Sequence, residues 1–372
     1  MKHKDLILVT GGAGFIGSHL VDALITKGYS VRILDNLSAP THNGKPPSWL
    51  NKKAEFIKGD VREKKDWVDA LMGVSFVFHL ASYMDYHLDF SKYFDTNAKS
   101  TALMYEIVVG NRLPVKKIIV ASSQSPYGEG KYKCRKHGIF YAQSRSVDQL
   151  KKHEWEVRCP QDRTVAKILP ELETDQLHPQ TPYAVSKIAS ERLCLILGKT
   201  HSIPSVALRY SIVQGSRQSF RHFYSGALRD FSVRAITGLP IATQEDAMQI
   251  RDFVNVHDVV DAHLLVLHSK KADYQVFNVG SGKATKIIDL ANTVCKVTGA
   301  KHSPVATREF RINSPRNSVM SIDKLKKLGY TPKRNLEDSV SEYVDWVRYF
   351  PQAIRYLKNT YAKMYKEGIL KR

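Results

Sequence analysis

The sequence predicts an α/β fold, in which a doubly wound parallel sheet is joined to a smaller C-terminal lobe. Short apolar runs typical of buried parallel strands alternate with helical patterns over residues 1–208. A glycine-rich turn lies where the first of these strands meets the first helix. The later chain is less regular and richer in arginine. We therefore assign residues 209–346 mainly to the smaller lobe, with a return to the first domain around 251–280, and residues 347–372 to a basic C-terminal helix.

The composition is that of an ordinary globular protein, with 43% hydrophobic and 25% charged residues. The net charge is +20, and lysine pairs such as Lys52-Lys53 and Lys326-Lys327 are scattered along the chain. This scatter favours a solvated basic surface over a nucleic-acid footprint. No apolar run reaches the about 18 residues of a membrane span, no secretory signal is visible, and the four cysteines suggest no disulfide framework. We expect a cytoplasmic protein with neither a nucleic-acid partner nor a membrane span.

The glycine-rich turn at residues 10–17 follows the apolar run 6–9 and opens a helix at Phe15 and Ile16. Its glycines are three residues apart: Gly11, Gly14 and Gly17. Such a turn lets the backbone approach a pyrophosphate, and the helix N-terminus offers free N–H groups. A second apolar strand ends at Asp35, about 20 residues further on, as in the dinucleotide-binding fingerprint of the Rossmann fold. A carboxylate at this position accepts hydrogen bonds from the ribose and repels a 2′-phosphate, so we expect NAD rather than NADP.

The next two strands also end in residues suited to the cofactor. The third, residues 54–61, ends in Asp60 and Val61. Asp60 could contact the adenine amino group, with Val61 against the ring, or could cap the helix that starts near Glu63. The fourth strand, residues 74–80, ends before the small residues Ala81 and Ser82, and its His79 is expected to be structural.

A helix over 95–109 and a fifth strand over 115–121 follow, and the strand delivers Ser122 to Gly128 to its C-terminal end. Ligands bind at that edge of an open parallel sheet. Residues 129–178 are polar and lack clear periodicity, so we expect an insertion there. Then Tyr183 and Lys187, four residues apart, lie on one face of a helix. A lysine ammonium and a bound nicotinamide cation both favour the phenolate, so this pattern predicts a tyrosinate base.

The remaining elements are shorter. A sixth strand over 205–210 and a further strand over 276–279 are expected in the same sheet, with a short strand over 249–258. Helices are expected over 259–267, 287–298, 336–349 and 351–366.

Together these residues resemble the extended short-chain dehydrogenase/reductases, in particular the NAD-dependent nucleotide-sugar epimerase/dehydratase group. The matching marks are the turn at 10–17, Asp35-Asn36, Gly59-Asp60-Val61, His79-Leu80-Ala81, Asn97, Ser122-Ser123, Tyr127-Gly128, Tyr183 with Lys187, Leu208-Arg209-Tyr210, Arg251-Asp252-Phe253 and Phe277-Asn278-Val279-Gly280.

The resemblance implies that the first lobe holds NAD and the second a nucleoside-diphosphate sugar. Tyr183 would be the base, Lys187 would orient the ribose and lower the pKa of Tyr183, and Ser123 would bridge to the sugar O4. The implied cofactor contacts are Gly11, Gly14, Phe15, Ile16, Gly17, Asp35, Asn36, Asp60, Val61, Leu80, Ala81, Ser82, Asn97, Tyr183 and Lys187. The implied substrate contacts are Ser123, Gln124, Arg217, Arg251 and Arg316, the arginines suiting a diphosphate. A homodimer is also implied.

Two positions separate reactions within the family. Related 4,6-dehydratases carry Asp-Glu after the catalytic hydroxyl and decarboxylases carry Glu, whereas this chain has Gln124-Ser125. This favours 4-epimerisation. The alternatives are a dehydrogenase that releases NADH and a non-catalytic NAD-binding scaffold, although a scaffold has no need of Ser123, Tyr183 and Lys187. The chain departs from the family at Ser211-Ile212, where Phe-Asn is usual, and at 313–315, where Pro-Gly-Asp is usual.

The insertion resembles one in a subset of sugar 4-epimerase-like proteins, where two Cys-x-x-Cys/His pairs could bind zinc. Here the pairs are Cys134-x-x-His137 and Cys159-x-x-Asp162. Four such ligands are chemically possible for zinc. Since one sulfur is replaced, a metal-free lid is favoured and no metal is expected.

Overall fold

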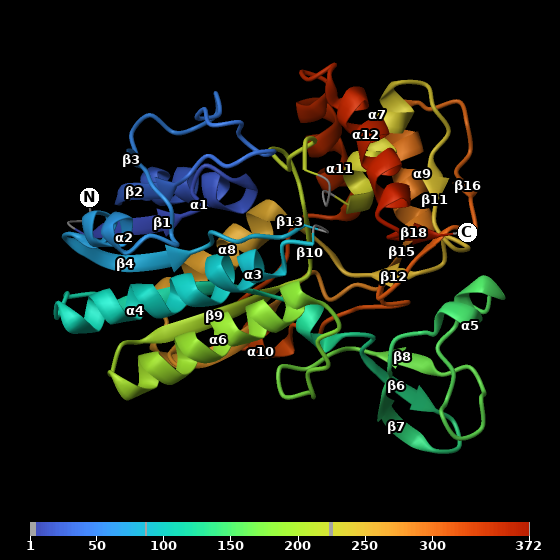
Figure 1. Cartoon of the computed structure of the whole chain (residues 1–372), viewed down its shortest axis with the longest axis horizontal. Coiled ribbons are helices and arrows are strands. Elements are labelled where there is room, and N and C mark those ends of the chain that lie inside the picture. Colours follow the sequence, from blue (N-terminus) through green and yellow to red (C-terminus); the bar gives the residue numbers. More distant parts are fainter. Residues whose placement is uncertain (1–4, 86–87, 223–225, 372) are drawn as a thin grey trace.

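A computed structural model of the chain describes residues 5–85, 88–222 and 226–371 (Figure 1). Its centre is a seven-stranded sheet in the order β14-β9-β5-β4-β1-β2-β3, and every neighbouring pair is parallel. The strands are β1 (Leu6–Thr10), β2 (Ser30–Asp35), β3 (Glu55–Lys58), β4 (Val74–His79), β5 (Lys117–Ser123), β9 (Ser205–Tyr210) and β14 (Gln275–Val279). The predicted α/β fold class is confirmed.

Apolar side chains fill both faces of this sheet. In β1, Ile7 and Val9 belong to one buried cluster and Leu8 to another, as the two-residue repeat of a strand requires. Helices α1 (Phe15–Thr26) and α8 (Val256–His268) contact each other along the first face. The other face is covered by α2 (Lys64–Leu71), α4 (Ser100–Gly110) and α6 (Pro182–Thr200). The continuous apolar runs in the sequence therefore reflect a sheet buried on both sides.

A second lobe, at the upper right of Figure 1, is built around four helices that share one apolar core. These are α7 (Gly226–Ile236), α9 (Ile287–Thr298), α11 (Leu336–Val347) and α12 (Ala353–Lys366). Among the described residues, four short strand pairings complete it: β10 (Ile212–Gln214) with β13 (Phe253–Asn255), β11 (Ala242–Thr243) with β16 (Val305–Ala306), β12 (Ile250–Arg251) with β15 (Thr285–Lys286), and β17 (Phe310–Arg311) with β18 (Leu370–Lys371). Helix α12 packs against α7, so the basic C-terminal helix is part of this lobe. The short helices α10 (Asp323–Lys326) and η3 (Lys270–Ala272) lie instead with the first lobe, where Leu325 and Ala272 join the apolar cluster of the large sheet.

Three expected elements differ in detail. The third strand spans Glu55–Lys58 rather than residues 54–61, because the chain turns at Gly59 and Asp60. The strand expected over 249–258 is divided into β12 and β13 at Asp252, whose carboxylate accepts hydrogen bonds from Ser281 and Gly282. It ends at Asn255, because the Asn255 side chain accepts the His257 N–H (2.8 Å) and so caps a helix that begins at Val256. The helix expected from residue 95 begins earlier, as α3 (Phe90–Tyr93), and continues through a π-helical turn, η1 (Phe94–Lys99), into α4.

The insertion at 129–178 leaves the sheet after the 3-10 turn η2 (Ser125–Tyr127) and lies at the lower right of Figure 1. It forms a small antiparallel sheet, β7-β6-β8, from β6 (Lys131–Cys134), β7 (Gly138–Tyr141) and β8 (Lys167–Leu169), together with α5 (Val147–Lys151). Strands of three or four residues are too short to give a periodic pattern, which explains why the sequence showed none.

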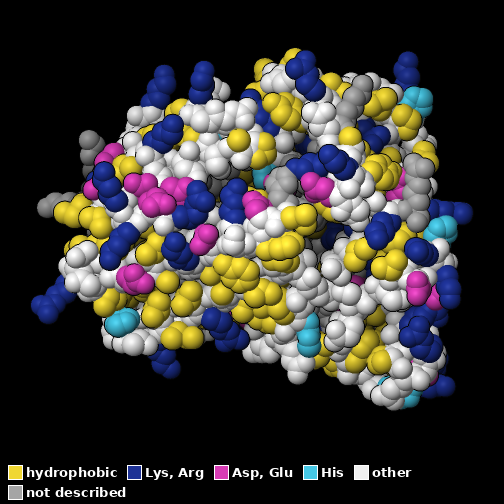
Figure 2. All heavy atoms as spheres, viewed as in Figure 1, with side chains coloured by type: hydrophobic (Ala, Val, Ile, Leu, Met, Phe, Trp, Pro, Cys, Tyr) yellow, Lys and Arg dark blue, Asp and Glu magenta, His cyan; other side chains and the backbone are white. Residues whose placement is uncertain are grey.

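Within the described ranges, no helix combines the length and apolar character needed to cross a membrane. Figure 2 shows lysine and arginine side chains spread over the visible face rather than gathered on one element. This distribution agrees with the solvated basic surface predicted from the scattered lysine pairs.

Candidate active site

The glycine turn leaves room for a ligand at the N-terminus of α1. Gly11 has φ +67°, and a Cβ there would lie 2.9 Å from the backbone of Ala81. A Cβ on Gly17 would lie 2.2 Å from the Gly11 carbonyl oxygen, so α1 could not pack on the turn. Gly14 occupies the N-cap position, where no side chain caps the first N–H groups of the helix. The turn therefore offers a close backbone approach and unshared donors, which suits a pyrophosphate.

We expect Gly17→Ala to weaken dinucleotide binding about tenfold or more, equivalent to at least about 1.4 kcal/mol, because the added methyl pushes α1 away from the turn. Isothermal titration of the nucleotide-free protein with NAD measures this. Gly110→Ala is the matched control, since a Cβ at that helical position meets nothing within 4 Å. Equal affinities in both variants would contradict the assigned role of the turn.

Asp35, at the end of β2, is held in place by the backbone. Its two carboxylate oxygens accept N–H bonds from Ala13 (3.1 Å) and Leu37 (2.9 Å). The side chain is buried, and burial raises the pKa of Asp35. The Asp35 carboxylate thus lies beside the glycine turn, where a dinucleotide needs an acceptor for its ribose hydroxyls.

The Asp60 side chain is hydrogen-bonded to neighbouring residues and does not cap the following helix. Its carboxylate accepts hydrogen bonds from Asn36 (2.9 Å) and from two nitrogens of the Arg62 guanidinium (3.0 and 2.7 Å). Partial burial alone would raise the pKa of Asp60, but these bonds bring it down to about 2. Because α2 begins at Lys64 with Glu63 in the N-cap position, Asp60 is not the helix cap. Val61 beside it is buried.

The end of β4 is tied to β1 and to the π-helical turn. The Thr10 hydroxyl accepts the N–H groups of Leu80 and Ala81, each at 3.1 Å. His79 lies between Thr10 (2.8 Å) and Ser100 (2.9 Å), and burial lowers its pKa to about 3. The imidazole is therefore neutral and bridges β1, β4 and α4.

Asn97, on the π-helical turn, joins three segments. Its carbonyl oxygen accepts from Ser82 (3.0 Å) and from the Tyr83 N–H (2.8 Å), and its amide donates to the Ser186 hydroxyl (2.9 Å). Local π-helical turns occur often at functional sites. Asn97 thus fixes the loop after β4 against the helix that carries the candidate base.

The candidate base itself has the expected hydroxyl partner. Helix α6 starts with Thr181, whose hydroxyl accepts the Ala184 N–H at 3.2 Å, and this cap places Tyr183 in the first turn. The Tyr183 hydroxyl lies next to the hydroxyls of Ser123, at the end of β5, and Ser82, and both act to lower its pKa. The structure therefore brings together two residues that are 60 positions apart in the chain, at the carboxyl edge of the sheet.

The electrostatics around Tyr183 differ from the expectation. Burial raises the pKa of Tyr183, and the Ser123 and Ser82 hydroxyls counter this only in part. Burial also lowers the pKa of Lys187 to about 8, whereas Glu191 acts to raise it. The residues of the protein alone therefore do not lower the pKa of Tyr183, because the effect of burial is larger than the opposing effect of the two serines. A further cation beside the phenol is needed, and a bound nicotinamide ring supplies one.

A buried polar network lies behind the base. Glu191 accepts two hydrogen bonds from the Arg209 guanidinium (2.6 and 2.9 Å) and one from the Ser122 hydroxyl (2.8 Å). Arg209 also donates to the Tyr127 hydroxyl (2.7 Å), which in turn donates to Asn278 (2.8 Å). Glu191 was not among the predicted site residues. Its position one turn after Lys187, on the same face of the helix, is the sequence feature that could have identified it.

The expected substrate residues are only partly grouped. Gln124 accepts a hydrogen bond from Ser318 (3.2 Å), and Ser123 contacts the Ser125 hydroxyl (3.1 Å). Arg217 is paired with Asp22 of α1 at 2.7 Å. Arg251 is half-buried and donates to the backbone carbonyls of residues 250, 315 and 316.

Arg316 is already saturated by carboxylates. Its guanidinium is bonded to Asp246 (2.7 Å), Glu156 (2.6 Å) and Glu245 (2.9 Å), and its side chain is almost completely buried. Glu245 also pairs with Arg145 of the insertion at 2.9 Å. A diphosphate would have to displace these partners, so the arginine is better placed to hold its loop than to bind substrate directly.

Glu129, at the start of the insertion, makes the contact between the insertion and the Arg316 loop dependent on pH. It accepts the Arg316 N–H and lies 3.9 Å from the Arg145 guanidinium, yet burial dominates and raises the pKa of Glu129 from 4.5 to about 7. The stability contributed by the protonated form is therefore present below about pH 4.5 and is lost as the pH rises through 7.

Relative to Glu129→Gln, the wild type should lose up to about 3 kcal/mol of unfolding free energy between pH 4.5 and pH 8. Urea denaturation of both proteins across this range measures the difference. Glu154→Gln, at an exposed insertion site 3.6 Å from Arg158, is the control and should follow the wild type. A constant difference between wild type and Glu129→Gln would refute the pKa assignment.

The four predicted ligand candidates of the insertion also meet. Cys134, His137, Cys159 and Asp162 each place one ligand atom within 4.8 Å of the other three.

Comparison with known proteins places the chain in a family. The model of the NAD dependent epimerase/dehydratase family matches residues 7–151 and 160–280. The dTDP-L-rhamnose 4-epimerase of Burkholderia thailandensis is 30% identical over 350 residues, covering 92% of this chain and 94% of that protein. The structure of UDP-glucose 4-epimerase from Thermotoga maritima with UDP-glucose superposes with a TM-score of 0.74 at 29% identity, covering 92% and 99% of the two chains. The Thermus thermophilus UDP-glucose 4-epimerase complex with NAD gives a TM-score of 0.73 at 28% identity, with coverage of 92% and 99%.

Proposed function

The chain belongs to the NAD dependent epimerase/dehydratase family, and from this premise we propose that it inverts C4 of a nucleoside-diphosphate sugar through a transient 4-keto sugar. The observation that carries the proposal is that Tyr183 and Ser123 come together at the carboxyl edge of the sheet, in a fold whose glycine turn fits a pyrophosphate. Ligands of open parallel sheets bind at this edge.

The cofactor is NAD, held by the glycine turn, by Asp35 at the ribose, and by the end of β4. Bound NAD supplies the redox chemistry by taking up hydride and giving it back. Tyr183 takes the proton from the sugar O4, and Ser123, which lies next to the Tyr183 hydroxyl, orients that sugar hydroxyl. Lys187 positions the ribose and adds positive charge beside the phenol.

The residues after Ser123 support epimerisation over elimination or decarboxylation. Gln124 and Ser125 carry no ionisable group, and they are held by hydrogen bonds with Ser318 and Ser123. A dehydratase needs an acid and a base to move protons at C5 and C6. Because these residues are neutral, they offer no acid or base for elimination or decarboxylation of the 4-keto sugar. Return of hydride to C4 is the outcome that remains.

For the substrate diphosphate we propose Arg251 and Arg217, with Gln124 beside the sugar. Arg316 acts on the same loop, since its backbone carbonyl accepts from Arg251 at 2.9 Å while its own guanidinium is held by carboxylates. A planar guanidinium recognises phosphate well, which supports Arg251 in this role. For the lobe limits we keep the prediction from the sequence, residues 1–208 for the cofactor and mainly 209–346 for the sugar nucleotide.

We also propose a cytoplasmic homodimer. Apolar side chains are exposed on α3, η1 and α6, namely Phe90, Phe94, Val185 and Ile196. In Figure 2 hydrophobic side chains gather where Figure 1 places these elements. A second copy packing on this face would bury them, and light scattering should then give the mass of two chains.

The first test is the content of the purified protein. Denaturation should release NAD in a ratio of about one per chain, measured by absorbance and mass spectrometry, as expected of a cofactor that is regenerated in every cycle. The protein should then equilibrate a sugar nucleotide with its 4-epimer in a panel containing UDP-glucose and dTDP-L-rhamnose. Empty protein that needs added NAD and accumulates NADH would instead indicate a dehydrogenase. Failure to bind any nicotinamide cofactor would overturn the proposal.

A further inference from the structure

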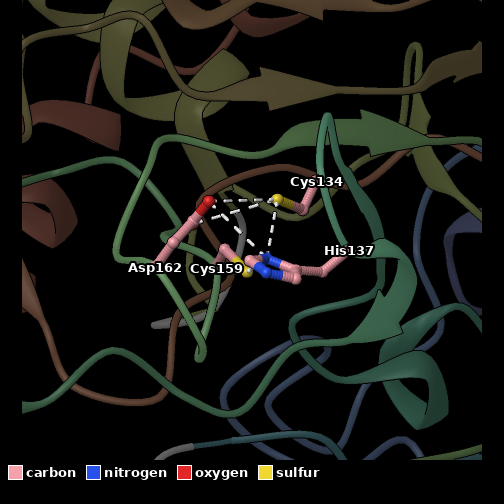
Figure 3. Close-up of side chains that lie close together, drawn as sticks. All are labelled: Cys134, His137, Cys159 and Asp162. Carbon is pink, nitrogen blue, oxygen red and sulfur yellow. Dashed lines mark hydrogen bonds and ion pairs between the residues drawn. The ribbon is translucent and has the colours of Figure 1, made fainter.

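We propose that Cys134, His137, Cys159 and Asp162 form a structural zinc site that cross-links the two turns of the insertion (Figure 3). The site lies outside the catalytic centre and does not depend on the proposed reaction. Figure 3 shows the four side chains pointing toward one another from two separate segments of the chain.

The distances between the ligand atoms are those that a tetrahedral zinc ion imposes. Cys134 Sγ lies 3.6 Å from His137 Nδ1 and 3.9 Å from the Asp162 carboxylate oxygens. His137 Nδ1 lies 3.4 Å from Cys159 Sγ and 3.6 Å from Asp162 Oδ2. Zinc bonds of about 2.3 Å to sulfur and about 2.0–2.2 Å to nitrogen or oxygen separate tetrahedral neighbours by about 3.4–3.8 Å.

The backbone prepares both cysteines as ligands. Cys134 ends β6, and the tight turn to β7 directs the N–H groups of Lys136 and His137 at its sulfur. Cys159 opens a second turn, closed by the hydrogen bond from its N–H to the Thr164 carbonyl (2.8 Å). The N–H groups of Gln161 and Asp162 point at its sulfur in the same manner. N–H donors aimed at sulfur stabilise the thiolate, which is the form that binds metal.

The Asp162 carboxylate is oriented by groups outside the four ligands. Its Oδ1 accepts hydrogen bonds from the Thr164 hydroxyl (2.7 Å) and N–H (3.1 Å). These bonds leave Oδ2, which faces His137, as the better ligand atom. Outer-shell bonds of this kind are typical of metal sites.

The donor set selects zinc. Two thiolates and an imidazole are ligands that zinc prefers, and magnesium or calcium would require mainly oxygen. Two thiolates and a carboxylate around a divalent cation leave a net charge of −1. The exposed side chains of Lys133, Arg135, Lys136 and Arg163 flank the ligands in sequence and offset this charge. With four protein ligands the site is closed, which indicates a structural rather than a catalytic ion.

The insertion has a small apolar core. One cluster holds four buried residues, Tyr132, Ala142, Val157 and Ala166, and a second packs Leu150 and Trp155 against Phe310 of the smaller lobe. Small modules with so few core side chains commonly rely on a metal or a disulfide. Because Glu129 and Glu171 join this module to Arg316 and Ser318, zinc would also steady the edge of the candidate substrate site.

The test uses the full-length protein purified with zinc in the medium. Elemental analysis should give about one zinc per chain for the wild type and for Cys295→Ser, a control cysteine of the smaller lobe. Cys134→Ser and Cys159→Ser should lose the metal. Asp162→Cys should keep it and resist a competing chelator about tenfold better or more, since thiolate replaces carboxylate. Cobalt added to the metal-free protein should give the absorption of a tetrahedral thiolate site.

Two results would overturn the proposal. One is a wild-type protein that carries no zinc and gives no cobalt–thiolate absorption after removal of bound metal. The other is a Cys134–Cys159 disulfide in the native protein, identified by peptide mapping without reduction. The gain in chelator resistance of Asp162→Cys keeps the test decisive even if the serine variants fold poorly.

Discussion

Tyr183→Phe is expected to reduce epimerisation by about 10³-fold, within the range of about 10²–10⁴ typical of a lost general acid or base. The variant removes only the phenolic hydroxyl, which lies next to Ser123 and Ser82. The ring remains beside Tyr93, at a centroid distance of 6.5 Å, so packing is preserved. NAD content and the urea midpoint should therefore stay near the wild-type values while kcat falls.

Tyr349→Phe is the matched control, since that phenol is 82% exposed and lies outside the candidate active site. It should leave kcat unchanged. If Tyr183→Phe retained more than about a tenth of the wild-type rate, the proton would have to leave through another group, and the assignment of Tyr183 as base would fail.

Glu191→Gln is expected to lower the free energy of unfolding by about 3–5 kcal/mol, because it leaves the buried Arg209 charge without its partner. The two side chains are almost completely shielded from water and are joined by bonds of 2.6 and 2.9 Å. The network also holds Ser122, next to the candidate catalytic Ser123. Activity measured below the unfolding transition should consequently fall as well.

An exposed ion pair provides the comparison. Lys296 and Glu337 are also 2.7 Å apart, but their side chains are 68% and 49% exposed. Glu337→Gln should change stability by less than about 1 kcal/mol, because water screens the pair. If Glu191→Gln and Glu337→Gln had similar urea midpoints, burial would not be the reason that the Glu191–Arg209 pair stabilises the fold.

The sheet and the position of the candidate base were predictable because short-range patterns encode them. Continuous apolar runs identify strands buried on both faces, and Gly11 and Gly17 must be glycine because a Cβ at either position would collide with the backbone. Tyr183 and Lys187 share a helix, so their common face followed from spacing alone.

Other features depend on contacts between distant segments, which spacing does not encode. Arg316 has the sequence position of a substrate ligand, yet Glu156, Glu245 and Asp246 meet it from three separate places in the chain. The pKa of Tyr183 was expected to fall, but the amount of burial could not be judged from the pattern. The insertion's strands are too short to show periodicity, and only the fold reveals that its two Cys-x-x pairs converge.

The fate of deuterium at C4 shows whether hydride leaves the sugar and returns to it on a retained cofactor. The substrate is a sugar nucleotide labelled with deuterium at C4, chosen from those that the protein accepts, and the reaction runs without added NAD. If hydride leaves C4 and returns to it within one cycle, the 4-epimer keeps the label, as mass spectrometry and NMR will show. Loss of the label to solvent, or accumulation of a 4-keto sugar with NADH, would contradict epimerisation by a retained cofactor.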